Sequence, residues 1–202
     1  MSEDSPCWAA DRAWSGHPLD SARLRLRRVT LADAVWVAEA ASHWEVARFT
    51  RLPHPLTRAG AEVFIAEKIG PMPLGEAVVL AIEDRSTGAP LGMIGVHVDH
   101  QSNSGELGYW LRHERWGEGL MTEAVRRLAR LAFRPLGLDR LTADVLPDNT
   151  ASGRLLHKAG FTRSCGTVGC LARGEVLEAV RWTLYASDWE TAWSARPMVL
   201  VT

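Results

Sequence analysis

Apolar and polar residues recur along this chain with two different periods, and these periods separate expected strands from expected helices. Residues 24–27 alternate leucine and arginine, which indicates a half-buried strand. Thr30 followed by Asp33 forms an approximate capping box and predicts the start of a helix. The two prolines within residues 51–55 interrupt the pattern. A strand and a helix are therefore expected before this break.

The middle of the chain predicts a second helix followed by an antiparallel meander. Thr57 is the expected N-cap of this helix, and Gly70 and Pro71 end it. Turn residues separate the apolar runs that come next, which favours hairpin connections. The expected strands lie at residues 77–82, 91–98 and 106–111.

The second half of the chain alternates helix and strand. From Gly117 to Pro135 apolar residues recur at spacings of three and four, which indicates a long amphipathic helix. This series after the meander predicts an α/β chain with a mixed sheet. The remaining expected elements are a strand at 141–146, a helix at 149–159, and a last β section that begins at 160–161 and is closed by 176–185.

Length and composition favour one domain. The 202 residues are 47% hydrophobic and 23% charged, which excludes a disordered or fibrous chain. A net charge of −1 argues against a nucleic-acid-binding protein. No apolar run reaches the roughly 18 residues that span a membrane, the N-terminus lacks a secretion signal, and three cysteines form no disulfide framework. We expect a cytoplasmic protein that does not bind membranes.

The expected domain is bounded by a segment on either side. Residues 1–22 show no periodicity and are expected to be an extension that is partly ordered at best, although Trp8 and Trp14 are candidates for docking on the domain or on a partner. Residues 23–190 form the single domain, and residues 191–202 are expected to be a C-terminal tail.

The strand at 106–111 runs into a glycine-containing turn that opens the long helix. The first turn of a helix has backbone N–H groups without partners and an electropositive end. Gly117 and Gly119 carry no side chain, so a phosphate can approach these amides closely. The plainer alternative is that the two glycines only form the turn.

This turn resembles the acyl-CoA-binding motif of the GNAT superfamily of N-acetyltransferases. Residues 116–121, Trp-Gly-Glu-Gly-Leu-Met, occupy the motif, and tryptophan in its first place is similar to the branch that acetylates ribosomal-protein N-termini (the RimJ/RimL type). Two residues depart from the pattern: Met121 replaces a small residue, and Glu118 places an acid beside the expected diphosphate.

A second block, residues 145–161, resembles the family signature N-x-x-S…L-x-K-x-G-F, and the resemblance extends from about Leu24 to Tyr185. It implies the GNAT fold, a central mixed and mostly antiparallel twisted sheet flanked by helices. It also implies direct attack of a primary amine, a protein N-terminus or a small amine, on acetyl-CoA. Members of this branch often pair, so the hairpin from 161 to 185 suggests a homodimer.

The resemblance also implies which residues contact the cofactor. A backbone amide between Tyr109 and Leu111 is expected to bind the thioester oxygen, and Asn149 to contact the pantetheine arm besides capping its helix. The expected cofactor-binding residues are Tyr109, Trp110, Leu111, Trp116, Gly117, Glu118, Gly119, Leu120, Met121, Thr122, Asn149, Ser152, Arg154 and Lys158.

Acetyl transfer to an amine needs proton acceptors and donors. The amine must lose a proton before it attacks, and the thiolate must gain one. Many GNAT members donate from a tyrosine whose place is taken here by Leu156, so Ser152 is the candidate acid; alternatively, its hydroxyl bonds back into its own helix. Glu106 is the candidate base, or else an exposed charge at the strand end. His43 is a weaker candidate than Glu106, and His97 and His113 are weaker still.

Other readings stay open. Cys165 and Cys170 lack histidines at metal-ligand spacing, so no metal is expected. The arginines at 126, 130 and 134 form one helical stripe, interpreted as a solvated face or, alternatively, as a contact for the CoA 3′-phosphate. The same fold could use another acyl-CoA, such as succinyl-CoA, or an antibiotic-like amine. A CoA-binding or interaction module whose catalytic groups have been lost is the non-enzyme alternative.

Overall fold

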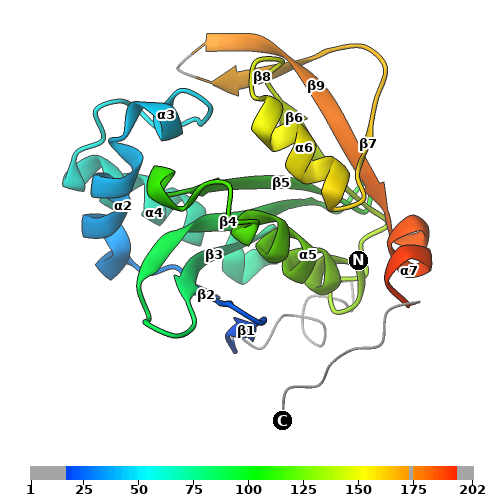
Figure 1. Ribbon diagram of the computed structural model, residues 1–202, viewed down its shortest axis with the longest axis horizontal. Coiled ribbons are helices and arrows are strands. Elements are labelled where there is room, and N and C mark those ends of the chain that lie inside the picture. The colour runs from blue at the N-terminus through cyan, green and yellow to red at the C-terminus, as the bar shows by residue number, and fades with distance from the viewer. Residues whose placement is uncertain (1–16, 173–174, 195–202) are drawn as a thin grey trace, which may run out of the picture.

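A nine-stranded sheet runs through the molecule, with helices on both of its faces (Figure 1). The computed structural model describes residues 17–172 and 175–194, so Trp8 and Trp14 lie outside the described residues. The strands are β1 (Leu19–Asp20), β2 (Leu24–Arg28), β3 (Ala77–Asp84), β4 (Pro90–Asp99), β5 (Ser104–Leu111), β6 (Arg140–Val145), β7 (Thr162–Arg163), β8 (Val168–Ala172) and β9 (Glu175–Tyr185).

The strand order along the sheet is β1-β2-β3-β4-β5-β6-β9-β7, and β8 pairs with β9 off this path. Of the described strand pairs only β5–β6 is parallel. The expected mixed, mostly antiparallel sheet is therefore confirmed. Two parallel strands need a long crossover connection. Here the helix α5 (Leu120–Phe133), which lies between β5 and β6 in the sequence, provides it.

The helical segments divide between the two faces of the sheet. One core packs α2 and α4 against one face, and the other packs α5 against the opposite face. Figure 1 shows α5 and α6 side by side in front of the sheet. The segments are η1 (Leu31–Asp33), α2 (Ala34–Ala41), α3 (Trp44–Ala47), α4 (Arg58–Ile69), η2 (Met72–Leu74), η3 (His113–Arg115), α5 (Leu120–Phe133), α6 (Thr150–Lys158) and α7 (Ala186–Ser194).

Local sequence signals determine where several helices begin. The Thr57 hydroxyl accepts a hydrogen bond from the Gly60 N–H at 3.1 Å, and the Asn149 side chain accepts one from the Ser152 N–H at 3.1 Å. Both residues therefore cap helices as predicted, because each side-chain oxygen satisfies an N–H that the first helical turn leaves free.

Asp33 connects the first helical segment to the sheet. Its carboxylate accepts hydrogen bonds from the Thr30 N–H at 2.8 Å, from the Arg27 guanidinium at 2.7 Å and from the Trp36 indole at 2.7 Å. Burial alone would raise the pKa of Asp33, but these donors lower it to about 2. The capping pair predicted from Thr30 and Asp33 is thus part of a larger network that includes β2.

Four observations go beyond the expected elements. Leu19 pairs with Leu26, so part of the expected N-terminal extension lies in the sheet. The segment between the opening helices contains the short helix α3. The last β section contains three strands, and α7 continues past residue 190. The limits of the domain at residues 23 and 190 stay predictions. Within the described ranges no helix is both long enough and apolar enough to cross a membrane.

Candidate active site

The parallel strands β5 and β6 separate soon after they pair. Their register covers only Ser104–Glu106 of β5 and Arg140–Thr142 of β6, although β5 continues to Leu111. A cavity of about 450 Å³ opens where they part, lined by both strands, β4, the turn before α5, and the start of α6. Sequence periodicity predicted both strands but not this opening, because the opening depends on where pairing stops.

Most residues predicted for the site meet in this cavity. Glu118 is not among the lining residues, because its carboxylate pairs with Arg115, Nε to Oε1 2.8 Å. The predicted residues that line the cavity are Glu106, Tyr109, Trp110, Leu111, Trp116, Gly117, Gly119, Leu120, Met121, Thr122, Asn149, Ser152, Arg154 and Lys158.

The turn before α5 exposes backbone amides to the cavity. Gly117 and Gly119 have φ angles of +82° and +76°, in the left-handed region that glycine adopts without strain. The N–H of Glu123 donates to the Gly119 carbonyl at 3.2 Å as the first bond of the helix. The amides that precede it lie at the electropositive helix end, which suits an anionic ligand.

The acidic residues near this turn are paired with arginines. The hydrogen bond from Arg115 lowers the pKa of Glu118 and keeps it ionised. Arg23 binds the Glu123 carboxylate through Nε at 2.8 Å and donates through Nη1 to the Glu118 carbonyl at 3.0 Å. The acid that departs from the motif is therefore neutralised locally and leaves the amides free for an anion.

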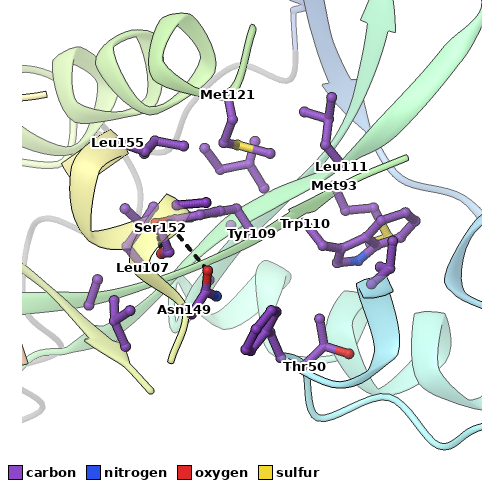
Figure 2. A pocket seen from close by; sticks show the side chains of 18 of the residues that line it. Thr50, Met93, Leu107, Tyr109, Trp110, Leu111, Met121, Asn149, Ser152 and Leu155 are labelled. Atoms are coloured by element: carbon purple, nitrogen blue, oxygen red, sulfur yellow. Dashed lines mark hydrogen bonds between the residues drawn. The ribbon is translucent and has the colours of Figure 1, made fainter. Parts of the chain in front are cut away.

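Met121, the second departure from the motif, belongs to the core. Only 8% of it is exposed, and it packs in the cluster that joins α5 to the sheet. Figure 2 shows its side chain between Leu155 of α6 and Leu111 of β5. Its side chain thus contributes both to the core under α5 and to the wall of the cavity.

Tyr109 and Ser152 form a hydroxyl pair on the face of the sheet that α5 covers. The two oxygens lie 2.7 Å apart, although the residues are 43 positions apart in sequence. Figure 2 shows Tyr109 pointing toward Ser152 of α6, while Trp110 points the other way, toward Met93. Burial raises the pKa of the Tyr109 phenol well above its usual value, so the phenol stays protonated. Leu156, at the family's tyrosine position, is fully buried.

The Tyr109 hydroxyl was not predicted as a functional group. The sequence suggested only the backbone of this residue, because the resemblance concerns the strand and not its side chains. The alternation of side chains along a strand could have indicated it. This alternation places Tyr109 on the same face as Leu107 and Leu111, which is the face that α5 covers.

Charged side chains gather on the opposite face. His97 of β4 and Glu106 of β5 are direct cross-strand partners, so their side chains project to the same side. Glu106 Oε1 lies 2.7 Å from Arg51 Nη2. Burial, followed by the Lys68 ammonium, lowers the pKa of His97, so the imidazole is neutral near pH 7. Arg51, Lys68, His97 and Glu106 all line the cavity.

The remaining histidine candidates lie elsewhere. His43 and His113 stack on each other with ring centroids 4.3 Å apart, and neither lines the cavity. The Nδ1 of His43 accepts a hydrogen bond from the Glu45 N–H at 3.3 Å and so caps α3. His97, ranked below His43 from the sequence, is the histidine that reaches the site.

Comparison with known proteins identifies the family. Residues 23–162 match the family described as "Acetyltransferase (GNAT) domain". The chain is 31% identical over 174 residues to "Uncharacterized N-acetyltransferase p20" of Bacillus licheniformis, covering 83% of this chain and 95% of that protein. It is 33% identical over 146 residues to "Uncharacterized N-acetyltransferase YoaA" of Bacillus subtilis, covering 72% and 82%. The chain belongs to the GNAT acetyltransferase family.

Solved structures agree with the GNAT fold. The ribosomal-protein-S5-alanine acetyltransferase of Vibrio fischeri has a TM-score of 0.72 at 20% identity, covering 86% of this chain and 98% of that one. RimJ of Mycobacterium smegmatis, solved in complex with CoA-disulfide, has a TM-score of 0.70 at 20% identity, covering 85% and 89%. The predicted family and the predicted fold are confirmed, and the chain is an N-acetyltransferase.

The arginine stripe predicted on α5 is not part of the lining of the cavity of this GNAT acetyltransferase. The arginine stripe of α5 contacts neighbouring elements: Arg126 donates to the Lys158 carbonyl at 2.7 Å, and Arg134 lies 3.2 Å from Glu190 of α7. No group of three or more histidine, cysteine or acidic side chains suited to a metal occurs among the residues that the structure describes.

Proposed function

We propose that this chain transfers an acetyl group from acetyl-CoA to a primary amine, a protein N-terminus or a small amine, by direct attack of the amine on the thioester. The observation that carries this proposal is the opening between β5 and β6, with a hydroxyl pair on one face and charged groups on the other. Acetyl-CoA in this opening would place its diphosphate at the amides of α5 and its thioester where an amine can reach it from the other face.

The chain's own groups suit the parts of acetyl-CoA. The amides between Gly117 and Thr122 would bind the diphosphate, since they lie at a helix N-terminus whose acidic neighbours are paired. Asn149, Arg154 and Lys158 line the same cavity and would contact the pantetheine arm and the nucleotide end. A backbone N–H between Tyr109 and Leu111 would donate to the thioester oxygen.

The proton that the thiolate gains would come from the hydroxyl pair. With the Tyr109 phenol protonated and donating to Ser152 Oγ, the proton of Ser152 is free to point at the leaving sulfur. The serine then stabilises the negative charge only as it develops, which is the condition for lowering the barrier.

Glu106 is proposed to receive the acceptor amine on the other face. Its carboxylate, positioned by Arg51, would hold the ammonium form and take its proton. His97 beside it is a neutral imidazole and can pass that proton toward solvent. Glu106 is thus the proposed base, and His97 a second group in the same proton path.

Thiol release is expected when the chain is mixed with acetyl-CoA and an amine. The panel should contain peptides with free N-termini and small amines, with each acceptor omitted in turn. Succinyl-CoA in place of acetyl-CoA tests the acyl preference. Binding of acetyl-CoA without thiol release from any acceptor would contradict the proposed transfer and support the alternative of a binding module.

Ser152→Ala is expected to lower turnover by roughly ten- to a hundredfold, about 1.4 to 2.7 kcal/mol of barrier, with little change in acetyl-CoA binding. The loss lies at or below the lower end of the usual range for a general acid because a thiol, with a pKa near 8.5, is a fair leaving group. Tyr109→Phe is the companion variant, since it keeps the serine hydroxyl but removes its partner. Full activity in Ser152→Ala would refute this role.

We also propose that the protein works in the cytoplasm as a homodimer. Strands β8 and β9 form a hairpin on which Val176 is 75% exposed. An exposed apolar strand is usually covered by another part of the protein or by a second chain. Light scattering at micromolar concentration is expected to report twice the chain mass of 22.3 kDa. A particle of single-chain mass would refute the dimer.

A further inference from the structure

The acceptor side of the cavity carries one ammonium, that of Lys68, with no ion pair among the described residues. Glu45 and Asp144 also line the cavity, and each is paired with an arginine, Arg48 at 2.9 Å and Arg181 at 2.8 Å. Arg51 follows α3, Lys68 lies in the last turn of α4, His97 is on β4 and Glu106 is on β5, and all four line the cavity. Arg51 and Glu106 neutralise each other at 2.7 Å. Because His97 is neutral, the ammonium of Lys68 is the excess charge of this group.

Lys68 is half-buried, and no carboxylate within the described ranges lies in ion-pair distance of it. The Phe64 ring lies 5.6 Å from the ammonium. Burial, and then the charge of Arg51, lower the pKa of Lys68, and the charges of Glu67 and Glu106 oppose this shift without cancelling it. A partly desolvated charge is normally paired, so a site with this excess charge suits an anionic partner that arrives with the ligand.

We infer that Lys68, assisted by Arg51, forms a carboxylate-binding subsite, and that the preferred acceptors are amines that carry a carboxylate close to the amine. This inference rests on the proposed function, because it concerns the acceptor of the same reaction. Two sources share this chemistry: the acidic side chain of a peptide N-terminus and the α-carboxylate of a free amino acid.

The arrangement matches both charges of such an acceptor. Glu106 offers a carboxylate to the acceptor's ammonium, and Lys68 offers an ammonium to its carboxylate, within one cavity on one face of the sheet. The opposite pattern, an acceptor with a second cation near its amine, would place like charges beside Lys68 and Arg51. Electrostatic complementarity of this kind selects among ligands that are otherwise alike.

The test compares acceptors that differ only in charge. Peptides that begin with aspartate or asparagine form one arm, and free alanine and its α-amide form the other, with kcat/KM measured for each. We expect the carboxylate form to be preferred by about tenfold or more in at least one arm. The arm that shows the preference identifies the source of the carboxylate.

Lys68→Met tests the residue itself, because methionine keeps much of the length and removes the charge. The ratio of kcat/KM between carboxylate and amide acceptors is expected to fall to about one, and Lys68→Arg is expected to restore most of it. Arg58→Met is the matched control on the same helix, since Arg58 is exposed, pairs with Glu62 and does not line the cavity. Its ratio should equal that of the parent chain.

The outcomes separate this inference from the proposed function. Turnover of neutral amines with no advantage for a carboxylate would overturn the inference and leave the proposed transfer intact. A preference that survives in Lys68→Met would overturn the role of Lys68. Absence of thiol release with every acceptor would overturn the proposed function, and the inference with it.

Discussion

Replacing Gly119 with valine is expected to abolish the rise in melting temperature that acetyl-CoA produces. At 100 times its Kd a ligand stabilises the native state by about 2.7 kcal/mol, roughly 5 to 11 °C for a chain of this size. Gly119 has a φ of +76°, and the space that a Cβ would enter there is empty except for Arg23 at 3.9 Å. A β-branched side chain strains this backbone and occupies the space in front of the amides.

The effect of backbone strain in Gly119→Val must be distinguished from blocked binding of acetyl-CoA. Gly88→Val is the matched control, because Gly88 has a φ of +74°, lies in the turn between β3 and β4 and has no atom within 4 Å of a Cβ. Both variants should melt earlier than the parent chain without ligand. Only Gly119→Val should lose the dependence on acetyl-CoA, and a normal ligand-induced rise in it would show that the diphosphate binds elsewhere.

Glu106→Gln is expected to lower kcat by about 100-fold or more at pH 7, the usual effect of removing a general base. The defect should shrink as the pH rises, because an amine with a pKa between about 8 and 10 loses its proton to solvent without help. The rise of kcat with pH should therefore occur at a higher pH in the variant than in the parent chain. Steady-state kinetics between pH 6 and 10 would measure this shift.

Two further variants test whether the shift in the pH profile is specific to Glu106. Glu62→Gln removes an exposed carboxylate that pairs with Arg58 outside the cavity, and its pH profile should match that of the parent chain. His97→Gln tests the second group of the proposed proton path, the His97 imidazole. The pKa of His97 is lowered below 6.5, so in the parent chain this imidazole becomes protonated, and stops accepting a proton, only as the pH falls below that value. Unchanged profiles in both Glu106→Gln and His97→Gln would mean that positioning and backbone amides suffice.

Local patterns along the chain predicted the elements of the fold well. Every strand and helix expected from periodicity is present, with ends within three residues, apart from the first helix, whose opening turn is η1. Thr57 and Asn149 cap helices because capping involves a side chain and an amide three residues away, an interaction that sequence spacing alone specifies. Strand β1 and the helices α3 and α7 lacked so clear a period and were not predicted.

The glycine turn and its helix were likewise determined by sequence, because a left-handed backbone and free amides are properties of a few consecutive residues. What only the tertiary structure decided is which side chains share the cavity. Tyr109 meets Ser152 across 43 positions, and Arg51 meets Glu106 across 55. Such contacts depend on strand register and on where β5 and β6 part, and these follow from packing of the whole sheet. For the same reason His97, not His43, reaches the site, and Lys68 lies half-buried within it.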